Sequence, residues 1–195
     1  MPRKPREFAA GGIYHVFNRG NNRKILFKTG KDYECFKGLL KAGQNREDVK
    51  IYHYCLMSNH FHLLIQSGEK QSLPRFMHWV QLGYARYFKR KYQTTGHVFE
   101  ERYRSPRIAQ ESYYLQCGRY IERNPVKAKI VLQAENYLYS SAGYYVRGCK
   151  DPLVTENLYY KGLGKSPGER QIAYKDFVRV EEPYAELIND HLLKY

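Results

Sequence analysis

Two apolar runs separated by a short polar turn constrain the fold more than any other feature of the sequence. Residues 49–57 (VKIYHYCLM) are rich in β-branched and aromatic side chains, and residues 61–65 (FHLLI) form a second apolar run. The turn between them contains Ser58 and Asn59. Because runs of this length and composition favour strands, we predict two antiparallel strands joined by a tight turn.

One strand and one helix are predicted before this hairpin. Residues 13–18 alternate in polarity as a strand does, and residues 19–23 form a turn-like basic loop. Apolar side chains then recur at helical spacing from Asp32, a candidate N-cap, to the region of Gly43. This pattern predicts an amphipathic helix of about three turns.

Two helices and one strand are predicted after the hairpin. Ser72 is a candidate N-cap of a long helix, with Pro74 in its first turn, where a missing amide hydrogen costs least. Residues 97–105 read as a strand that runs into a basic loop. A third helix is expected from about residue 110 to 123, stopped or kinked by Pro125.

This order of elements predicts an α+β fold. Strand, helix, strand, strand, helix, strand is the order of the ferredoxin-like antiparallel sheet with helices on one face, and the third helix is an addition to it. We expect residues 1–150 to form one catalytic domain and residues 151–195 a C-terminal extension packed on or beside it. A chain of 195 residues suits one such unit, since domains commonly have ~100–200 residues.

The charge of the chain limits the classes of partner. Lysine and arginine number 33 against 19 acidic residues, which gives a net charge of +14 and favours a polyanion such as nucleic acid. The apolar runs are shorter than the ~18 residues of a spanning helix, and the first residues lack a secretory signal. We therefore predict a cytoplasmic protein with no membrane partner. The cysteines form no C-x-x-C pair, which argues against a zinc knuckle.

Two histidines in the second strand of the hairpin are candidate metal ligands. Because side chains alternate along a strand, His60 and His62 project from one face while Phe61 and Leu63 project from the other. Two imidazoles on neighbouring positions of one face can both reach one cation. Spacing alone leaves open the alternative that they are polar residues on the solvent face of a sheet.

Four sequence blocks occur in a fixed order along the chain. They are residues 15–23 (HVFNRGNNR), 54–64 (YCLMSNHFHLL), 96–103 (GHVFEERY) and 119–128 (RYIERNPVKA). With these blocks, over about residues 13–141, the chain resembles the single-tyrosine HUH (IS200-like) transposases, and within them the REP-associated tyrosine transposases. The resemblance implies that residues 1–150 are the catalytic domain of such an enzyme.

The resemblance also implies roles for individual residues. It assigns His60 and His62 to a Mg²⁺ or Mn²⁺ ion and Tyr120 to the attack on DNA. Asn124 is the expected third ligand, because a residue four positions after Tyr120 lies on the same helix face. Pro125 weakens this prediction, since it biases the preceding residue away from helical geometry.

The activity implied is that of a metal-dependent single-stranded DNA endonuclease and strand transferase. Such an enzyme nicks and rejoins DNA next to hairpin (REP-like) sequences through a 5′-phosphotyrosine intermediate, acting as a homodimer or as a monomer. The candidate DNA-binding residues, each of which also fits a solvated surface, are Arg19, Arg23, Lys24, Arg86, Lys89, Arg90, Arg102, Arg104 and Arg107. A basic N-terminal arm is expected at Arg3, Lys4 and Arg6.

Two other functions remain open at this stage. A protein of the same fold that binds hairpins without catalysis would need a change at the metal or nucleophile positions, and none is present. A zinc-dependent hydrolase that uses the histidines and a water nucleophile predicts that Tyr120→Phe stays active. His15, on the face of Ile13 and Phe17, is expected to be a half-buried structural histidine.

Overall fold

A four-stranded antiparallel sheet forms the centre of the protein. The computed structural model describes residues 7–109 and 112–180. The strands lie in the order β2-β3-β1-β4, which is the ferredoxin-like order, so the predicted α+β fold and the hairpin are confirmed. Their bounds are β1 Ile13–Arg19, β2 Val49–Met57, β3 His60–Ser67 and β4 Arg107–Ile108.

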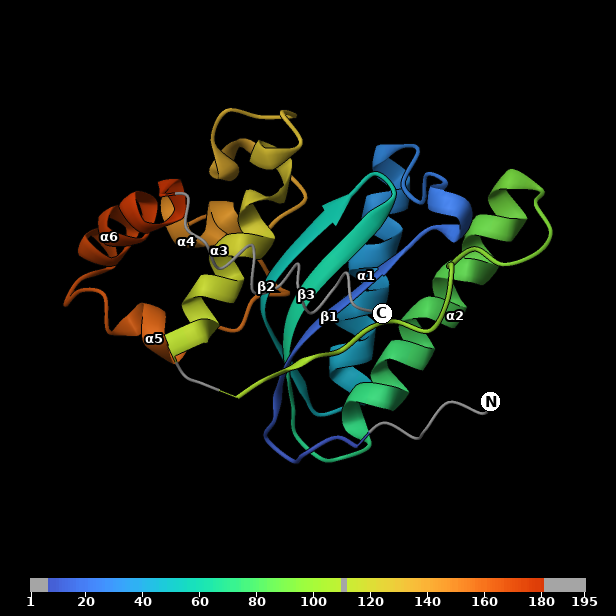
Figure 1. The fold of residues 1–195 in the computed structure, drawn as a ribbon, viewed down its shortest axis with the longest axis horizontal. Coiled ribbons are helices and arrows are strands. Elements are labelled where there is room, and N and C mark those ends of the chain that lie inside the picture. The colour runs from blue at the N-terminus through green and yellow to red at the C-terminus, as the bar shows by residue number, and fades with distance from the viewer. Residues whose placement is uncertain (1–6, 110–111, 181–195) are drawn as a thin grey trace.

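Helices cover both faces of the sheet. In Figure 1, α1 and α2 lie on one face, and α3 lies on the other with α4, α5 and α6 beyond it. The prediction of helices on one face thus holds for α1 and α2 alone. Helix bounds are α1 Gly30–Arg46, α2 Ser72–Tyr92, α3 Ser112–Lys127, α4 Ala142–Arg147, α5 Leu158–Lys161 and α6 Pro167–Arg179, and the short 3-10 helices are η1 Asn21–Arg23 and η2 Ala134–Asn136.

The alternation of side chains along β3 decides which face is packed against which helices. Phe61, Leu63 and Ile65 are fully buried in the core beneath α1 and α2, where they join Phe36 and Phe76. Burying side chains of this size stabilises the fold by roughly 1.5–3 kcal/mol each. The intervening residues of β3 therefore face α3.

A bulge in β2 changes the alternation at one point. The pairing of β2 with β3 runs from Ile51 opposite Ile65 directly to His53 opposite Leu64, so Tyr52 is out of register. A bulge of this kind lets two consecutive side chains point to the same side. Tyr52 and His53 accordingly both contact the α3 side of the sheet.

Two predicted elements differ from the structure. The strand predicted over residues 97–105 is present only as isolated bridges at Phe99 and Arg104, followed by the two residues of β4. Residues 100–102 turn away from the sheet, and Pro106 has no amide hydrogen to donate to β1. The third helix neither stops nor bends off at Pro125 but continues to Lys127.

Some expectations lie outside the described residues. These are the basic arm at Arg3, Lys4 and Arg6 and the predicted start of the third helix at residue 110. Across residues 7–109 and 112–180, no helix combines the length and the apolar character that a membrane span requires.

Candidate functional site

The two histidines of β3 lie side by side on the face that α3 covers, and each has a hydrogen-bond partner at Nδ1. The His60 and His62 rings are 5.1 Å apart between centroids. Nδ1 of His60 lies 2.7 Å from Oδ1 of Asn59, and Nδ1 of His62 lies 2.9 Å from Nε2 of His15. Because both Nδ1 atoms are engaged, Nε2 is the nitrogen of each ring that remains for a cation.

Burial keeps these three imidazoles neutral. It lowers the pKa of His62 well below its usual value, an effect increased by His15 and His60, and it lowers the pKa of His15 to about 3. It also lowers the pKa of His60 to about 4, with Asn124 opposing the shift and Arg19 adding to it. A neutral imidazole is the form that binds a metal ion.

Helix α3 brings Tyr120 to these histidines. Its ring stands edge-on to His62, with centroids 5.9 Å apart, and edge-on to His15 at 5.8 Å. The ammonium group of Lys127 lies 4.8 Å from the centroid of the same ring. Burial, and then the proximity of Cys117, raise the pKa of the Tyr120 phenol. The phenol is therefore neutral at rest.

Asn124 lies one helical turn after Tyr120, and Pro125 helps to orient its side chain. Nδ2 of Asn124 donates to the carbonyl of Tyr120 at 2.9 Å and to the carbonyl of Ile121 at 3.1 Å. Pro125 cannot donate a backbone hydrogen bond to Ile121, so the amide of Asn124 takes that place. With Nδ2 held on the helix, Oδ1 is left to face His60, which Asn124 contacts.

The donor set fits a divalent cation if Asn124 takes part. Two neutral imidazole nitrogens and one amide oxygen are ligands that suit first-row transition ions, while Mg²⁺ prefers oxygen ligands and water. Over the described residues, no group of three or more His, Cys, Asp or Glu side chains could hold a metal ion. An ion at His60 and His62 therefore needs Asn124, water or substrate oxygens to complete its coordination.

His15 is a site residue whose role the sequence analysis missed. It is 1% exposed, more deeply buried than predicted, and it bonds directly to His62. The available signal was its place on a strand face with Phe17, because Phe17 pairs with His62 across β1 and β3. A second nitrogen partner of this kind fixes the orientation of a ligand imidazole.

A comparison with protein families decides to which group the chain belongs. The family described as "Transposase IS200 like" matches residues 10–124, a range that includes β1, the hairpin, Tyr120 and Asn124. The chain belongs to the IS200-like transposase family. It is thus a transposase, an enzyme that acts on DNA.

Solved structures resemble this transposase in fold. A REP-associated tyrosine transposase bound to a REP hairpin is 17% identical, with a TM-score of 0.64, covering 81% of this chain and 93% of the other. A transposase candidate from Deinococcus radiodurans R1 is also 17% identical, with a TM-score of 0.43, covering 63% of this chain and 97% of the other. The comparison with curated proteins finds no match.

The predicted DNA-binding residues of the transposase fall into separate groups. Arg19 and Arg104 form ion pairs with Glu100 and Glu101 respectively, the latter pair at 3.6 Å. Arg19 pairs with His60 across β1 and β3 and so lies at the edge of the site. The others are exposed: Arg23 and Lys24 in and after η1, Arg102 and Arg107 near β4, and Arg86, Lys89 and Arg90 on α2, across the sheet from α3.

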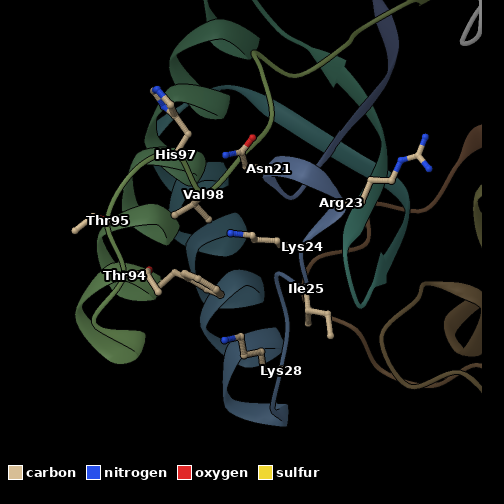
Figure 2. A pocket seen from close by; sticks show the side chains of 10 residues that line it. Asn21, Arg23, Lys24, Ile25, Lys28, Thr94, Thr95, His97 and Val98 are labelled. Atoms are coloured by element: carbon tan, nitrogen blue, oxygen red, sulfur yellow. The ribbon is translucent and has the colours of Figure 1, made fainter.

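A pocket of about 520 Å³ adjoins the first of these groups. Figure 2 shows Lys24 and Lys28 reaching into the space beside Val98, while Arg23 extends to the other side. Apolar side chains form much of its lining, and charged ends lie among them. The lining residues are Asn21, Arg23, Lys24, Ile25, Lys28, Phe88, Thr94, Thr95, His97 and Val98.

The loop that carries this pocket is tightly wound and fixed to the metal-ligand strand. Asn22 and Arg23 have positive φ angles of 52° and 58°, which non-glycine residues rarely adopt. A Cβ at Gly20 would lie 2.0 Å from the carbonyl oxygen of Lys24. The amide of Gly20 donates to the carbonyl of Asn59 at 2.8 Å, so the loop adjoins the residue that holds His60.

Proposed function

We propose that this transposase nicks and rejoins single-stranded DNA next to hairpin sequences, with Tyr120 as nucleophile and with Mg²⁺ or Mn²⁺ held by His60, His62 and Asn124. The observation that carries the proposal is the contact of the Tyr120 ring with His62, on the same face of α3 as Asn124. A nucleophile and a set of metal ligands from distant parts of the chain thereby meet in one place.

The residues of the site divide the work. His15 and Asn59 hold the two imidazoles through their Nδ1 atoms, and α3 presents Tyr120 and Asn124 to them. A divalent ion, when bound, polarises the scissile phosphate and neutralises its developing charge. Packing of α3 on the sheet places the phenol before DNA arrives, which lowers the entropic part of the barrier.

The reaction is an exchange of phosphodiester bonds. The Tyr120 oxygen bonds to phosphorus and releases its proton to solvent, while the bond from phosphorus to the 3′ oxygen breaks and that oxygen takes up a proton. The product is a 5′-phosphotyrosine with a free 3′-hydroxyl. Attack by a 3′-hydroxyl reverses the step, so joining needs no ATP.

Hairpin DNA is proposed as the partner. The structural neighbour with a bound REP hairpin and the net charge of +14 both support it. The pocket beside Lys24 and Lys28 has the apolar lining and cationic ends that an unpaired nucleotide would need, and we assign one nucleotide of the single strand to it. The predicted REP-associated subgroup, the domain division at residue 150 and the action as monomer or homodimer remain part of the proposal.

The test is a search for a covalent protein–DNA product. Incubation with labelled hairpin single-stranded DNA and Mn²⁺ is expected to give a protein-linked band on a denaturing gel. Tyr120→Phe should lose the band and keep hairpin binding, while Tyr114→Phe on the same helix should keep both. Cleavage by Tyr120→Phe would favour the zinc hydrolase, and binding without any linked product would favour the silent hairpin-binding protein.

A further inference from the structure

A second buried cluster lies on the side of α3 turned away from Tyr120. Its centre is Glu122, whose carboxyl group is fully buried. Oε1 of Glu122 accepts a hydrogen bond from Oγ of Ser141 at 2.6 Å and lies 2.9 Å from Nδ1 of His53. Oε2 accepts from the hydroxyl of Tyr174 at 2.8 Å. One carboxyl group on α3 is thereby held from three directions.

These partners come from three different parts of the fold. His53 is turned toward α3 by the bulge in β2, and its ring stacks on Tyr145 with centroids 4.4 Å apart. Ser141 precedes α4 and bonds through its amide to the carbonyl of Tyr54 in β2. Tyr174 lies in α6 and is fully buried. The carboxyl group therefore connects α3 to the sheet and to the C-terminal helix at once.

We propose that Glu122 is a positioning residue which, together with Tyr174 of α6, sets the rotation of α3 and so the place of Tyr120. The proposal rests on the function proposed above, in which Tyr120 is the nucleophile. Residues two apart on a helix point about 200° apart, so Glu122 holds the helix from the side opposite Tyr120. A rotation of roughly 10° moves a phenol oxygen by about 1 Å, and a misplacement of about 1 Å can slow a reaction ~100-fold.

The close contact of α3 with β2 supports a positioning role. A Cβ at Gly118, one turn before Glu122, would lie 2.7 Å from three atoms of the His53 ring. The stacked Tyr145 prevents that ring from yielding freely. Helix α3 is thus as near to the sheet as a glycine allows, and a side chain at this position must push it away.

Contacts from α3 to the end of α6 act in the same sense. A nitrogen of the Arg123 guanidinium donates to the carbonyls of Val178 and Arg179, at 3.0 and 2.7 Å. Free carbonyls at a helix C-terminus attract cations, so α6 receives α3 at its end as well as through Tyr174. Apolar side chains would fill this space at a lower desolvation cost, whereas a buried carboxyl group with three partners selects one arrangement.

The test compares the rate of covalent linkage with the affinity for hairpin DNA. Glu122→Gln, Tyr174→Phe and Gly118→Ala are made in the full chain, with Gly38→Ala as a matched helix control, because a Cβ at Gly38 meets nothing within 4 Å. Each is assayed in a single turnover with Mn²⁺ and labelled hairpin DNA, at a temperature well below its melting point. We expect the three site variants to slow linkage at least ~10-fold while hairpin affinity stays within ~3-fold, and Gly38→Ala to behave as wild type.

Further measurements separate positioning from folding and from failure of the proposed function. Glu122→Ala should be slower than Glu122→Gln, since glutamine keeps part of the hydrogen bonding, and Glu122→Gln with Tyr174→Phe should be less than additive. If Glu122→Gln does not fold, Tyr174→Phe and Gly118→Ala carry the test. Wild-type linkage rates in folded site variants, or a parallel loss of rate and affinity, would overturn the positioning role. Linkage by Tyr120→Phe would overturn the proposed function itself.

Discussion

The ring of Tyr120 stands edge-on to the ring of His62, with an angle of 87° between their planes. One residue belongs to α3 and the other to β3, and nothing local in the sequence joins them. Their contact exists because α3 packs against the sheet face that β1 and β3 expose. The site is therefore a product of tertiary packing, and changes that act on the packing should act on the chemistry.

The bond from His15 to His62 gives a first prediction. His15→Gln removes the imidazole that holds Nδ1 of His62, so the ligand ring loses its fixed orientation. Changes to such supporting residues typically cost ~10–100-fold in metal affinity. Mn²⁺ titration by calorimetry should show a loss of this size, whereas His78→Gln, at an exposed position on α2, should bind as wild type. Equal affinities for all three proteins would contradict the support role of His15.

Pro125 gives a second prediction, at the third ligand. Pro125→Ala restores a backbone donor for the carbonyl of Ile121, which then competes with the Asn124 amide for that carbonyl. The amide can turn, and we expect Mn²⁺ affinity to fall about threefold while thermal stability rises or stays the same. Asn124→Ala should lower affinity further. An unchanged affinity in Pro125→Ala would show that the helix carbonyls do not orient Asn124.

The pocket near Lys24 predicts a change in the salt dependence of DNA binding. Lys24→Gln should weaken single-stranded DNA binding and lower the slope of log affinity against log salt by about 0.7, the value for one lost phosphate contact. Lys150→Gln, at an exposed position after α4, matches the change in charge away from the pocket. Fluorescence anisotropy at several salt concentrations measures both slopes. The same slope for both variants would remove Lys24 from the DNA interface.

Asp32 holds the start of α1 against the end of α2. It is fully buried, and it accepts hydrogen bonds from Lys91 Nζ at 2.6 Å and from the hydroxyls of Tyr87 and Tyr92 at 2.8 and 2.7 Å. Burial alone would raise the pKa of Asp32, but the bonds from Lys91, Tyr92, Tyr87 and Thr29 outweigh it and hold the pKa well below its ordinary value of 3.8. The charged form is thus favoured by folding.

A fourth prediction concerns acid stability. Because the pKa of Asp32 is lower in the folded than in the unfolded chain, its stabilisation is present above pH ~4 and is lost as the pH falls toward the folded-state pKa. Asp32→Asn should lower the free energy of unfolding by on the order of 2 kcal/mol at pH 7, and by less at pH 3. Urea unfolding at both pH values measures this. Asp176→Asn, exposed on α6, is the control, and a pH-independent difference would contradict the assignment.

Local patterns predicted much of the fold and of the site. Alternation along residues 60–65 was enough to place His60 and His62 on one face, because a strand has a fixed side-chain period. The spacing of Tyr120 and Asn124 was likewise enough to place both on one helix face. Asp32, predicted as an N-cap, is instead the third residue of α1, where it forms a capping box with Thr29. Such shifts follow from the weak local signal at helix ends.

Features that depend on tertiary contacts were not predicted. The sequence carries no sign of the bulge at Tyr52, so the buried partnership of His53 and Glu122 could not be foreseen. Residues 97–105 contain good strand formers, but pairing requires amide donors and a straight course beside β1, and the chain turns away at 100–102. Pro125 was read as a helix stop because the side chain of Asn124 was not considered as a replacement donor.

The extra residue in β2 also bears on how two copies of this chain could associate. By aiming His53 at α3, the bulge makes the helix part of its own subunit through a buried carboxyl group. A dimer that exchanged α3 between subunits would first have to withdraw Glu122 from its partners and expose that charge. We expect such an exchange to be slow, and each subunit to cut DNA with its own tyrosine.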